Sequence, residues 1–377
     1  MEAYIINGYR SAVAKAKRGG FKNFRSDDLA VEVVKHLVSS VPKLDPKTVD
    51  DVIVGCANPE GEQGLQIGRL IAARSLGKEV PGITINRYCA SGLEAIALAV
   101  SKIKAGFGDI YIAGGTESMS LLPMTGYKLS PSYKANIDNI NYHVSMGATA
   151  EAVSSKYKIS REEQDNFSLN SQKKTEKAYS ENKFKDELIK LQIEDSDKKF
   201  IFEKDEHPRN NLKIDDLKKL KTVFKENGTV TPGNSSGIND GAAALVLMSR
   251  EQAEKKSLES LVKIVSWATC GVEPSLMGLG PIPSIQEALS KAKWKVDEVD
   301  LFEINEAFAA QSIAVIKELK LPEQKVNVNG GAIALGHPIG ASGSRILVTL
   351  IHEMIKQDKR KGCAALCIGG GMGIAMC

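Results

Sequence analysis

Cys89 is the residue whose setting most suggests covalent chemistry. It lies in NRYCASG (86–92), between an expected strand and an expected helix. A thiolate at a helix N-terminus is stabilised by the helix dipole and by free N–H groups. Because an ordinary thiol, with a pKa of about 8.5, is only slightly ionised at neutral pH, such a position favours a nucleophile. The structural alternative is a buried, inert cysteine, which is the commoner role of a lone cysteine.

Three further residues could take part in the same chemistry. His337 lies in the glycine-rich segment GGAIALGHPIGASG (330–343), where the backbone can approach a ligand closely. Cys367 ends an apolar stretch before three glycines, so its thiol could exchange a proton while the following N–H groups hold an oxyanion. Asn305 could orient a water, whereas the neighbouring Glu306 suits a structural acceptor equally well. A capping or core role remains the alternative for His337.

These residues alone permit a Cys/His acyltransferase, a cysteine hydrolase or a redox thiol protein. The absence of a CxxC motif disfavours the redox protein. Two cysteines and one histidine in three glycine-rich segments suit reversible acyl transfer better than hydrolysis, but spacing does not decide between them. The small-residue segment GNSSGINDGAAA (233–244) fits either the passage of a slender ligand or a simple turn before a strand.

Composition excludes several classes. Fifty basic against 46 acidic side chains give a net charge of only +4, which argues against non-specific nucleic-acid binding. The six cysteines and five histidines lack the spacing of a zinc site, so no metal is expected. No apolar run is long enough for a membrane-spanning helix, and no secretory signal is evident. We therefore expect reduced thiols in a cytoplasmic protein.

The elements that must position these residues form an α/β pattern. Strands are expected at 52–56, 83–86 and 110–113, and helices at 29–40 and 92–105. This pattern returns about 250 residues later: VDDVIVGCANPE resembles EVDLFEINEAFA, ASG (90–92) returns as ASG (341–343), and IYIAGGTESM resembles ALCIGGGMGI. We infer two copies of one α/β unit, the first interrupted by a charged, strand-poor insertion at about 119–233. The sequence predicts the N-terminus of one helix in the insertion, because Ser160 and Glu163 match a capping box.

Five segments together resemble the signatures of the thiolase family. NRYCASG, GTVTPGNSSGINDGAAA, FEINEAFAAQ, NVNGGAIALGHPIGASG and CIGGGMG occur in thiolase order and span essentially the whole chain. The resemblance implies two similar βαβ-type domains in a five-layered arrangement, with an inserted loop domain that covers coenzyme A. The expected divisions are 1–118 plus 234–260, 119–233, and 261–377.

The resemblance also implies a role for each candidate residue. Cys89 would accept the acyl group, His337 would take its proton, and Cys367 would be the second acid/base. Asn305 would position a water that forms one oxyanion hole with His337, while the N–H groups of Cys89 and Gly369 form the other. The family's substrate-binding positions match, in this sequence, Arg209, Ser236, Met146, Met277 and Phe308.

One departure from the family pattern bears on the substrate. Acetoacetyl-forming thiolases usually have a histidine before Met-Gly, but this chain has Ser145. Together with PEGEQGLQIGR (59–69), Ser145 favours the degradative 3-oxoacyl-CoA thiolases of fatty acid β-oxidation, with acetoacetyl-CoA synthesis as the alternative.

The resemblance further implies coenzyme A as a substrate, no cofactor, and a homodimer or homotetramer. A hydratase/dehydrogenase partner of β-oxidation is a further expectation. Two other readings share the fold: a decarboxylating ketoacyl synthase, disfavoured because only His337 lies in a motif, and a non-enzymatic acyl-CoA or lipid carrier.

Overall fold

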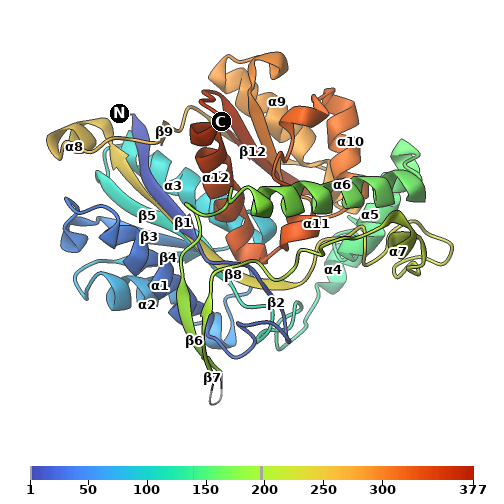
Figure 1. Cartoon of the computed structure of the whole chain (residues 1–377), viewed down its shortest axis with the longest axis horizontal. Coiled ribbons are helices and arrows are strands. Elements are labelled where there is room, and N and C mark those ends of the chain that lie inside the picture. Colours follow the sequence, from blue (N-terminus) through green and yellow to red (C-terminus); the bar gives the residue numbers. More distant parts are fainter. Residues whose placement is uncertain (1, 139, 196–197) are drawn as a thin grey trace.

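Two β-sheets organise the molecule, as the computed structural model shows for residues 2–138, 140–195 and 198–377 (Figure 1). The first sheet has seven strands, in the order β4-β3-β5-β8-β1-β9, with β2 paired to β8; the second has four, in the order β10-β13-β12-β11. The strands of the first sheet are β1 (Ala3–Arg10), β2 (Ala14–Lys15), β3 (Asp51–Gly55), β4 (Gly82–Ile85), β5 (Ile110–Glu117), β8 (Asn239–Ser249) and β9 (Val262–Lys263). Those of the second are β10 (Trp267–Gly271), β11 (Leu301–Ile304), β12 (Gly362–Ile368) and β13 (Met372–Met376).

The two sheets repeat one pairing pattern, which confirms the predicted internal repeat. In the first, β3 and β5 are parallel, while β5–β8 and β8–β1 are antiparallel. In the second, β11 and β12 are parallel, while β12–β13 and β13–β10 are antiparallel. The second unit joins β12 to β13 directly through residues 369–371, whereas residues 118–238 separate β5 from β8. The insertion in the first unit therefore occupies the position of the short turn that joins β12 to β13 in the second unit.

Helices fill the space between the sheets and cover both outer faces (Figure 1). Helices α3 (Ser91–Lys104) and α12 (Ile339–Lys356) pack together with residues of both sheets in one buried apolar cluster. Helix α1 (Ser26–Ser39) and α2 (Ile67–Ser75) cover the other face of the first sheet. Helices α9 (Pro281–Ala292) and α10 (Ala309–Leu319) cover the other face of the second. The result is the layered order helix, sheet, helix, sheet, helix.

The insertion lies outside both sheets, and its regular secondary structure is mainly helical. It contains α4 (Tyr133–Ile137), α5 (Met146–Tyr157), α6 (Arg161–Ser180) and α7 (Ile214–Lys218). The predicted capping box is confirmed at the start of α6, where Ser160 accepts from the Glu163 N–H and Glu163 accepts from the Ser160 N–H. The insertion also holds a hairpin that the polar sequence did not predict, β6 (Leu191–Asp195) with β7 (Lys198–Phe202). Two further short α-helices are α8 (Arg250–Lys255) and α11 (Ala332–Leu335).

The boundary expected between 260 and 261 does not coincide with the edge of the first sheet. Strand β9 pairs with β1, although the sequence analysis assigned Val262 to the second unit. Edge pairing of this kind is invisible to periodicity because a two-residue strand carries almost no pattern. Within the described ranges, no helix is both long and apolar enough to cross a membrane.

Candidate active site

The site is assembled where the N-terminal ends of α3 and α12 cross. Gly92 of α3 lies against α12: a Cβ there would stand 2.8 Å from the Ser344 N and 3.0 Å from the Gly340 O. Reciprocally, a Cβ on Gly343 would stand 2.3 Å from the Leu93 N. Only glycines allow the helix backbones to approach this closely. The crossing brings the segment before α3, which carries Cys89, to the segment before α12, which carries His337.

Cys89 lies in a single 3₁₀ turn (Tyr88–Ala90) ahead of α3. We expected the small residues after Cys89 to make the sharp turn, but Tyr88 carries the left-handed backbone, with φ of 44°. Asn86 stabilises this conformation because its Oδ1 accepts the Tyr88 N–H at 2.8 Å. Ser91 adds a second support, since its hydroxyl accepts the Arg87 N–H and donates to the Tyr88 carbonyl. The turn is therefore fixed by side chains on both sides of the sulfur.

We expected Cys89 to ionise easily, but desolvation of this half-buried side chain opposes ionisation. Removal of the sulfur from water raises the pKa of Cys89 to about 11, and the Glu117 carboxylate adds to the rise. The N–H groups of Gly369 and of Cys89 itself point to the sulfur and lower the pKa, but they do not offset the burial. A thiolate at Cys89 therefore needs a base to form at neutral pH.

His337 is buried and is held on three sides. Its N–H donates to Asn239 Oδ1 at 3.0 Å, its Nδ1 lies 2.5 Å from Ser342 Oγ, and its Nε2 lies 3.5 Å from Asn305 Nδ2. Burial, with a smaller contribution from the positive charge of Arg345, lowers the pKa of His337 to about 3. The imidazole is therefore neutral at physiological pH, the state that can accept a proton.

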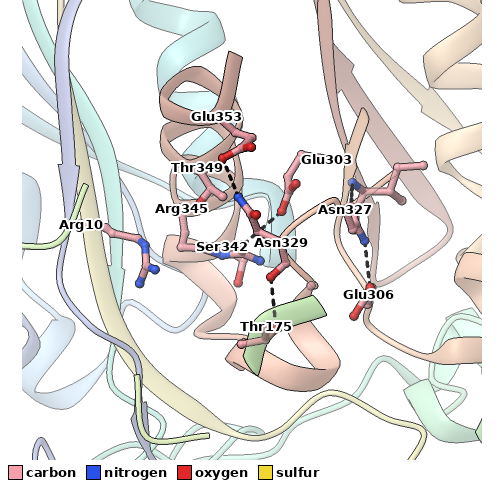
Figure 2. Close-up of polar contacts among 12 residues, drawn as sticks. Arg10, Thr175, Glu303, Glu306, Asn327, Asn329, Ser342, Arg345, Thr349 and Glu353 are labelled. Atoms are coloured by element: carbon pink, nitrogen blue, oxygen red, sulfur yellow. Dashed lines mark hydrogen bonds and ion pairs between the residues drawn. The ribbon is translucent and has the colours of Figure 1, made fainter. Parts of the chain in front are cut away.

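Asn305 follows β11 and presents a free acceptor to the site. Its N–H donates to the Ala365 carbonyl at 2.9 Å, and its side chain is fully buried. Its Oδ1 has no hydrogen-bond partner among the described residues. Glu306 takes the structural role that the sequence left open: it accepts from Ser171, Asn327 and the Ile333 N–H, which ties this loop to α6 and α11. Figure 2 shows the contact with Asn327.

Cys367 is a second thiol close to Cys89. It lies near the end of β12 and is buried. Burial raises the pKa of Cys367 well above its usual range, and the charge of a nearby Cys89 thiolate raises it further. The two thiols therefore lie close together, the Gly369 N–H points to the half-buried Cys89 sulfur, and the neutral His337 precedes the helix that packs against the Cys89 turn.

An apolar wall adjoins these polar groups. Met277, Phe308 and Cys367 belong to one buried cluster, and Met146 packs against it. The sulfur of Met146 would lie 3.5 Å from a Cβ on Gly369. Ser236 reaches the same loop through its N–H, which donates to the Ala307 carbonyl at 3.0 Å. Met146, Met277 and Phe308 therefore lie beside Cys367, and Ser236 bonds to the residue before Phe308.

Comparison with known proteins identifies the family of the chain. Residues 3–251 match the model of the thiolase N-terminal domain, and residues 258–377 match that of the thiolase C-terminal domain. The chain belongs to the thiolase family. It is 47% identical to the 3-ketoacyl-CoA thiolase of Bacillus subtilis (strain 168), over 99% of this chain and 98% of that protein.

Two further relatives carry a different name. The chain is 47% identical to an acetyl-CoA acetyltransferase of Syntrophomonas wolfei, over 100% of this chain and 98% of that protein. The crystal structure of the Bacillus anthracis acetyl-CoA acetyltransferase superposes with a TM-score of 0.92 at 40% identity, covering 100% of this chain and 98% of that one. The chain therefore has the thiolase fold and is an acyltransferase, while relatives of both names match it equally well.

Arg209, predicted to contact coenzyme A, lies on the surface beside α6. It is exposed, and its N–H donates to the Gln172 side chain on α6. The segment nonetheless approaches Ser236, because a Cβ on Gly237 would meet the ring of His207. Ser145, which departs from the short-chain thiolase pattern, caps α5 by accepting the Ala148 N–H.

Several residues around the pocket escaped the sequence analysis. Phe224 lies over Gly147 and meets Phe308 edge-on, with ring centroids 6.3 Å apart. Tyr142 lies over Gly370, and its hydroxyl is 3.0 Å from that of Tyr88. Both Phe224 and Tyr142 belong to the insertion and stay more than one-third exposed, and its polar composition did not predict their contacts with Phe308 and Tyr88. Among the described residues no group of three or more His, Cys, Asp or Glu could hold a metal ion.

Proposed function

We propose that this thiolase-family enzyme cleaves 3-oxoacyl-CoA with coenzyme A, giving acetyl-CoA and a shortened acyl-CoA through an acyl-Cys89 intermediate. The observation that carries the proposal is that two thiols, Cys89 and Cys367, lie close to each other, and that the neutral His337 precedes the helix that packs against the Cys89 turn. A thiolytic reaction needs one nucleophile, one base for it, and one separate acid/base for the enolate and the incoming thiol.

In the first half-reaction, Nε2 of His337 takes the proton of Cys89, and the thiolate attacks the 3-oxo carbon. The resulting oxyanion is stabilised by the new Nε2–H and by a water at Asn305, whose unpartnered Oδ1 supports that position. The bond between C2 and C3 then breaks. Cys367 protonates C2 of the acetyl-CoA enolate, whose thioester oxygen faces the N–H groups of Cys89 and Gly369.

In the second half-reaction, the Cys367 thiolate takes the proton of coenzyme A. The new thiolate attacks the acyl-Cys89 thioester, and the acyl-CoA leaves as the Cys89 sulfur recovers its proton from His337. Protons therefore balance over the cycle, with each acid/base returning to its starting state. Burial raises the pKa of both thiols, so both are protonated between turnovers.

We assign the degradative direction from Ser145, which stands where acetoacetyl-forming thiolases usually have a histidine. Support comes from the apolar wall of Met277 and Phe308, which suits an acyl chain. The alternative is synthesis of acetoacetyl-CoA from two acetyl-CoA molecules. Arg209 remains a proposed contact to the nucleotide part of coenzyme A, and a β-oxidation hydratase/dehydrogenase remains a proposed partner.

Turnover of a chain-length series tests the assignment. We expect kcat/KM for 3-oxohexanoyl-CoA and 3-oxooctanoyl-CoA to equal or exceed that for acetoacetyl-CoA, with Cys89→Ser inactive on all three. Activity on acetoacetyl-CoA alone would favour the synthetic alternative. No turnover at any length would contradict the proposed function.

A further inference from the structure

Ser342 is a buried hydroxyl in the first turn of α12 that the reaction scheme does not yet use. Its Oγ lies 2.5 Å from His337 Nδ1 and 2.8 Å from the Pro338 carbonyl oxygen. The side chain is fully buried. Figure 2 shows Ser342 on α12 close to Arg345, which in turn reaches Glu303.

The hydrogens available to these two contacts determine the tautomer of the His337 imidazole. The carbonyl oxygen of Pro338 can only accept, and the Ser342 hydroxyl carries a single hydrogen. Two contacts of 2.5 and 2.8 Å each need a hydrogen between their heavy atoms, since two lone pairs repel at that separation. The hydroxyl therefore donates to Pro338, and His337 supplies the second hydrogen as Nδ1–H. The opposite tautomer leaves the contact between Ser342 and Pro338 without a hydrogen.

The Nδ1–H tautomer determines what faces the reaction. With its hydrogen on Nδ1, neutral His337 presents a lone pair at Nε2, toward the Asn305 amide at 3.5 Å. That lone pair can accept from Asn305 Nδ2–H, which leaves Asn305 Oδ1 as the unpartnered acceptor of the site. Asn239 completes the arrangement, because its Nδ2 donates to the Ala14 carbonyl and its Oδ1 accepts the His337 N–H. The backbone N–H, Nδ1 and Nε2 of His337 are thus each in contact with a different residue: Asn239, Ser342 and Asn305.

We propose that Ser342 is a positioning residue that holds His337 in the Nδ1–H tautomer, so that every proton taken up by His337 enters at Nε2. The inference rests on the proposed function for its consequence: a proton from Cys89 converts Nε2 into the N–H donor that the following oxyanion requires. The base and the oxyanion donor are then one nitrogen in two successive states. Without the Ser342 acceptor, the hydrogen could occupy Nε2 at the start, and the imidazole could not act as the base there.

The tautomer can be read directly from protein labelled with ¹⁵N-histidine. At neutral pH the wild-type spectrum should show a protonated Nδ1 and an unprotonated Nε2 for His337, with His337→Asn used to assign the signals among five histidines. Ser342→Ala should move the hydrogen partly or wholly to Nε2. Ser284→Ala is the matched control, because Ser284 is an equally buried serine, in α9, whose hydroxyl donates to the Gly280 carbonyl four residues earlier.

Kinetics supply the second readout. Ser342→Ala should lower kcat by about 10- to 100-fold with little change in KM, by analogy with the loss of groups that orient a ligating or catalytic histidine. Ser284→Ala should stay close to wild type. An Nε2–H signal in the wild type, or an unchanged tautomer in Ser342→Ala, would overturn the proposal. Absence of turnover in the wild type would contradict the proposed function alone, since the spectrum reports the tautomer without turnover.

Discussion

Gly92 of α3 and Ser344 of α12 touch backbone to backbone, and this contact joins the two halves of the site. A Cβ on Gly92 would lie 2.8 Å from both the backbone nitrogen and the Oγ of Ser344. Neighbouring backbone cannot move aside as a flexible side chain can. The distance between the helices, and hence between Cys89 and His337, depends on that missing methyl group.

Gly92→Ala should therefore destabilise the fold and impair activity together. Overpacking of a buried contact typically costs about 1–3 kcal/mol in the free energy of unfolding. Urea unfolding and kcat measure the two effects. Gly271→Ala is the control, because a Cβ there would meet only the Gly371 carbonyl oxygen, at 4.0 Å. Equal stability of the two variants would contradict the close helix crossing.

Arg10 ties the insertion to the first sheet. Its guanidinium lies 2.5 Å from Glu187 and 2.8 Å from Asp205, two carboxylates of the insertion, and all three side chains are buried. Tyr179 adds a hydrogen bond to Asp205 at 2.6 Å. The charged group is thus paired and hydrogen-bonded, as a buried charge must be.

Arg10→Met should cost about 3–5 kcal/mol of unfolding free energy, because two buried carboxylates lose their counter-charge. We also expect faster proteolysis within residues 118–238, since the anchor of the insertion is lost. Lys177→Ala, which removes an exposed pair with Glu181, should leave both measurements unchanged. A stability change in Arg10→Met no larger than that of the control would refute the anchoring role.

The buried imidazole makes stability depend on pH. The pKa of His337 is about 3 in the folded state, whereas that of a histidine in the unfolded chain is about 6.5. Below pH about 6.5 the unfolded state binds a proton that the folded state does not, so the free energy of unfolding falls as the pH falls. The slope is about 1.4 kcal/mol per pH unit for one proton.

Replacing this histidine should remove that slope. His337→Asn keeps an N–H near Ser342 but does not titrate in this range. Between neutral pH and pH about 5, we expect the free energy of unfolding of the wild type to fall by about 2 kcal/mol more than that of the variant. Urea unfolding at a fixed protein concentration measures both curves. Parallel curves would mean that His337 is not held in a desolvated, neutral state.

Strand β4 forms an open edge of the first sheet, and apolar side chains lie close to it in sequence. Leu65 is fully exposed, and Leu70 and Ile83 are more than one-third exposed. An exposed apolar edge strand invites pairing with another chain. We expect at least a dimer in solution, and Leu65→Glu with Ile83→Glu should weaken it. Light scattering that finds only a 40.7 kDa species for the wild type would contradict this.

Much of the scaffold could be predicted because small and apolar residues carry it. The repeat was visible in ASG (90–92) and ASG (341–343), which mark the two helix starts that now cross at Gly92 and Gly343. The site residues Cys89, His337, Cys367 and Asn305 lie at ends of strands and helices, where function is usually found. Their segments were therefore recognisable without a structure.

What could not be predicted depends on contacts between distant segments. The pKa of Cys89 rises because the fold removes its sulfur from water, an effect larger than that of the local N–H groups. Ser342 stands five residues from His337, but spacing does not tell which ring nitrogen it meets. Phe224 reaches Phe308 only because the insertion folds back over the pocket.

The central claim is that Cys89 carries the acyl group, and mass spectrometry of the intact protein tests it most directly. Brief incubation with acetyl-CoA, acid quenching and peptide mapping should show one acetyl group on Cys89. Cys89→Ala should show none, and Cys367→Ala, which keeps the nucleophile and its base, should still become acetylated. An enzyme that turns over thioesters without an adduct on Cys89, or with the adduct on Cys367 instead, would contradict the account.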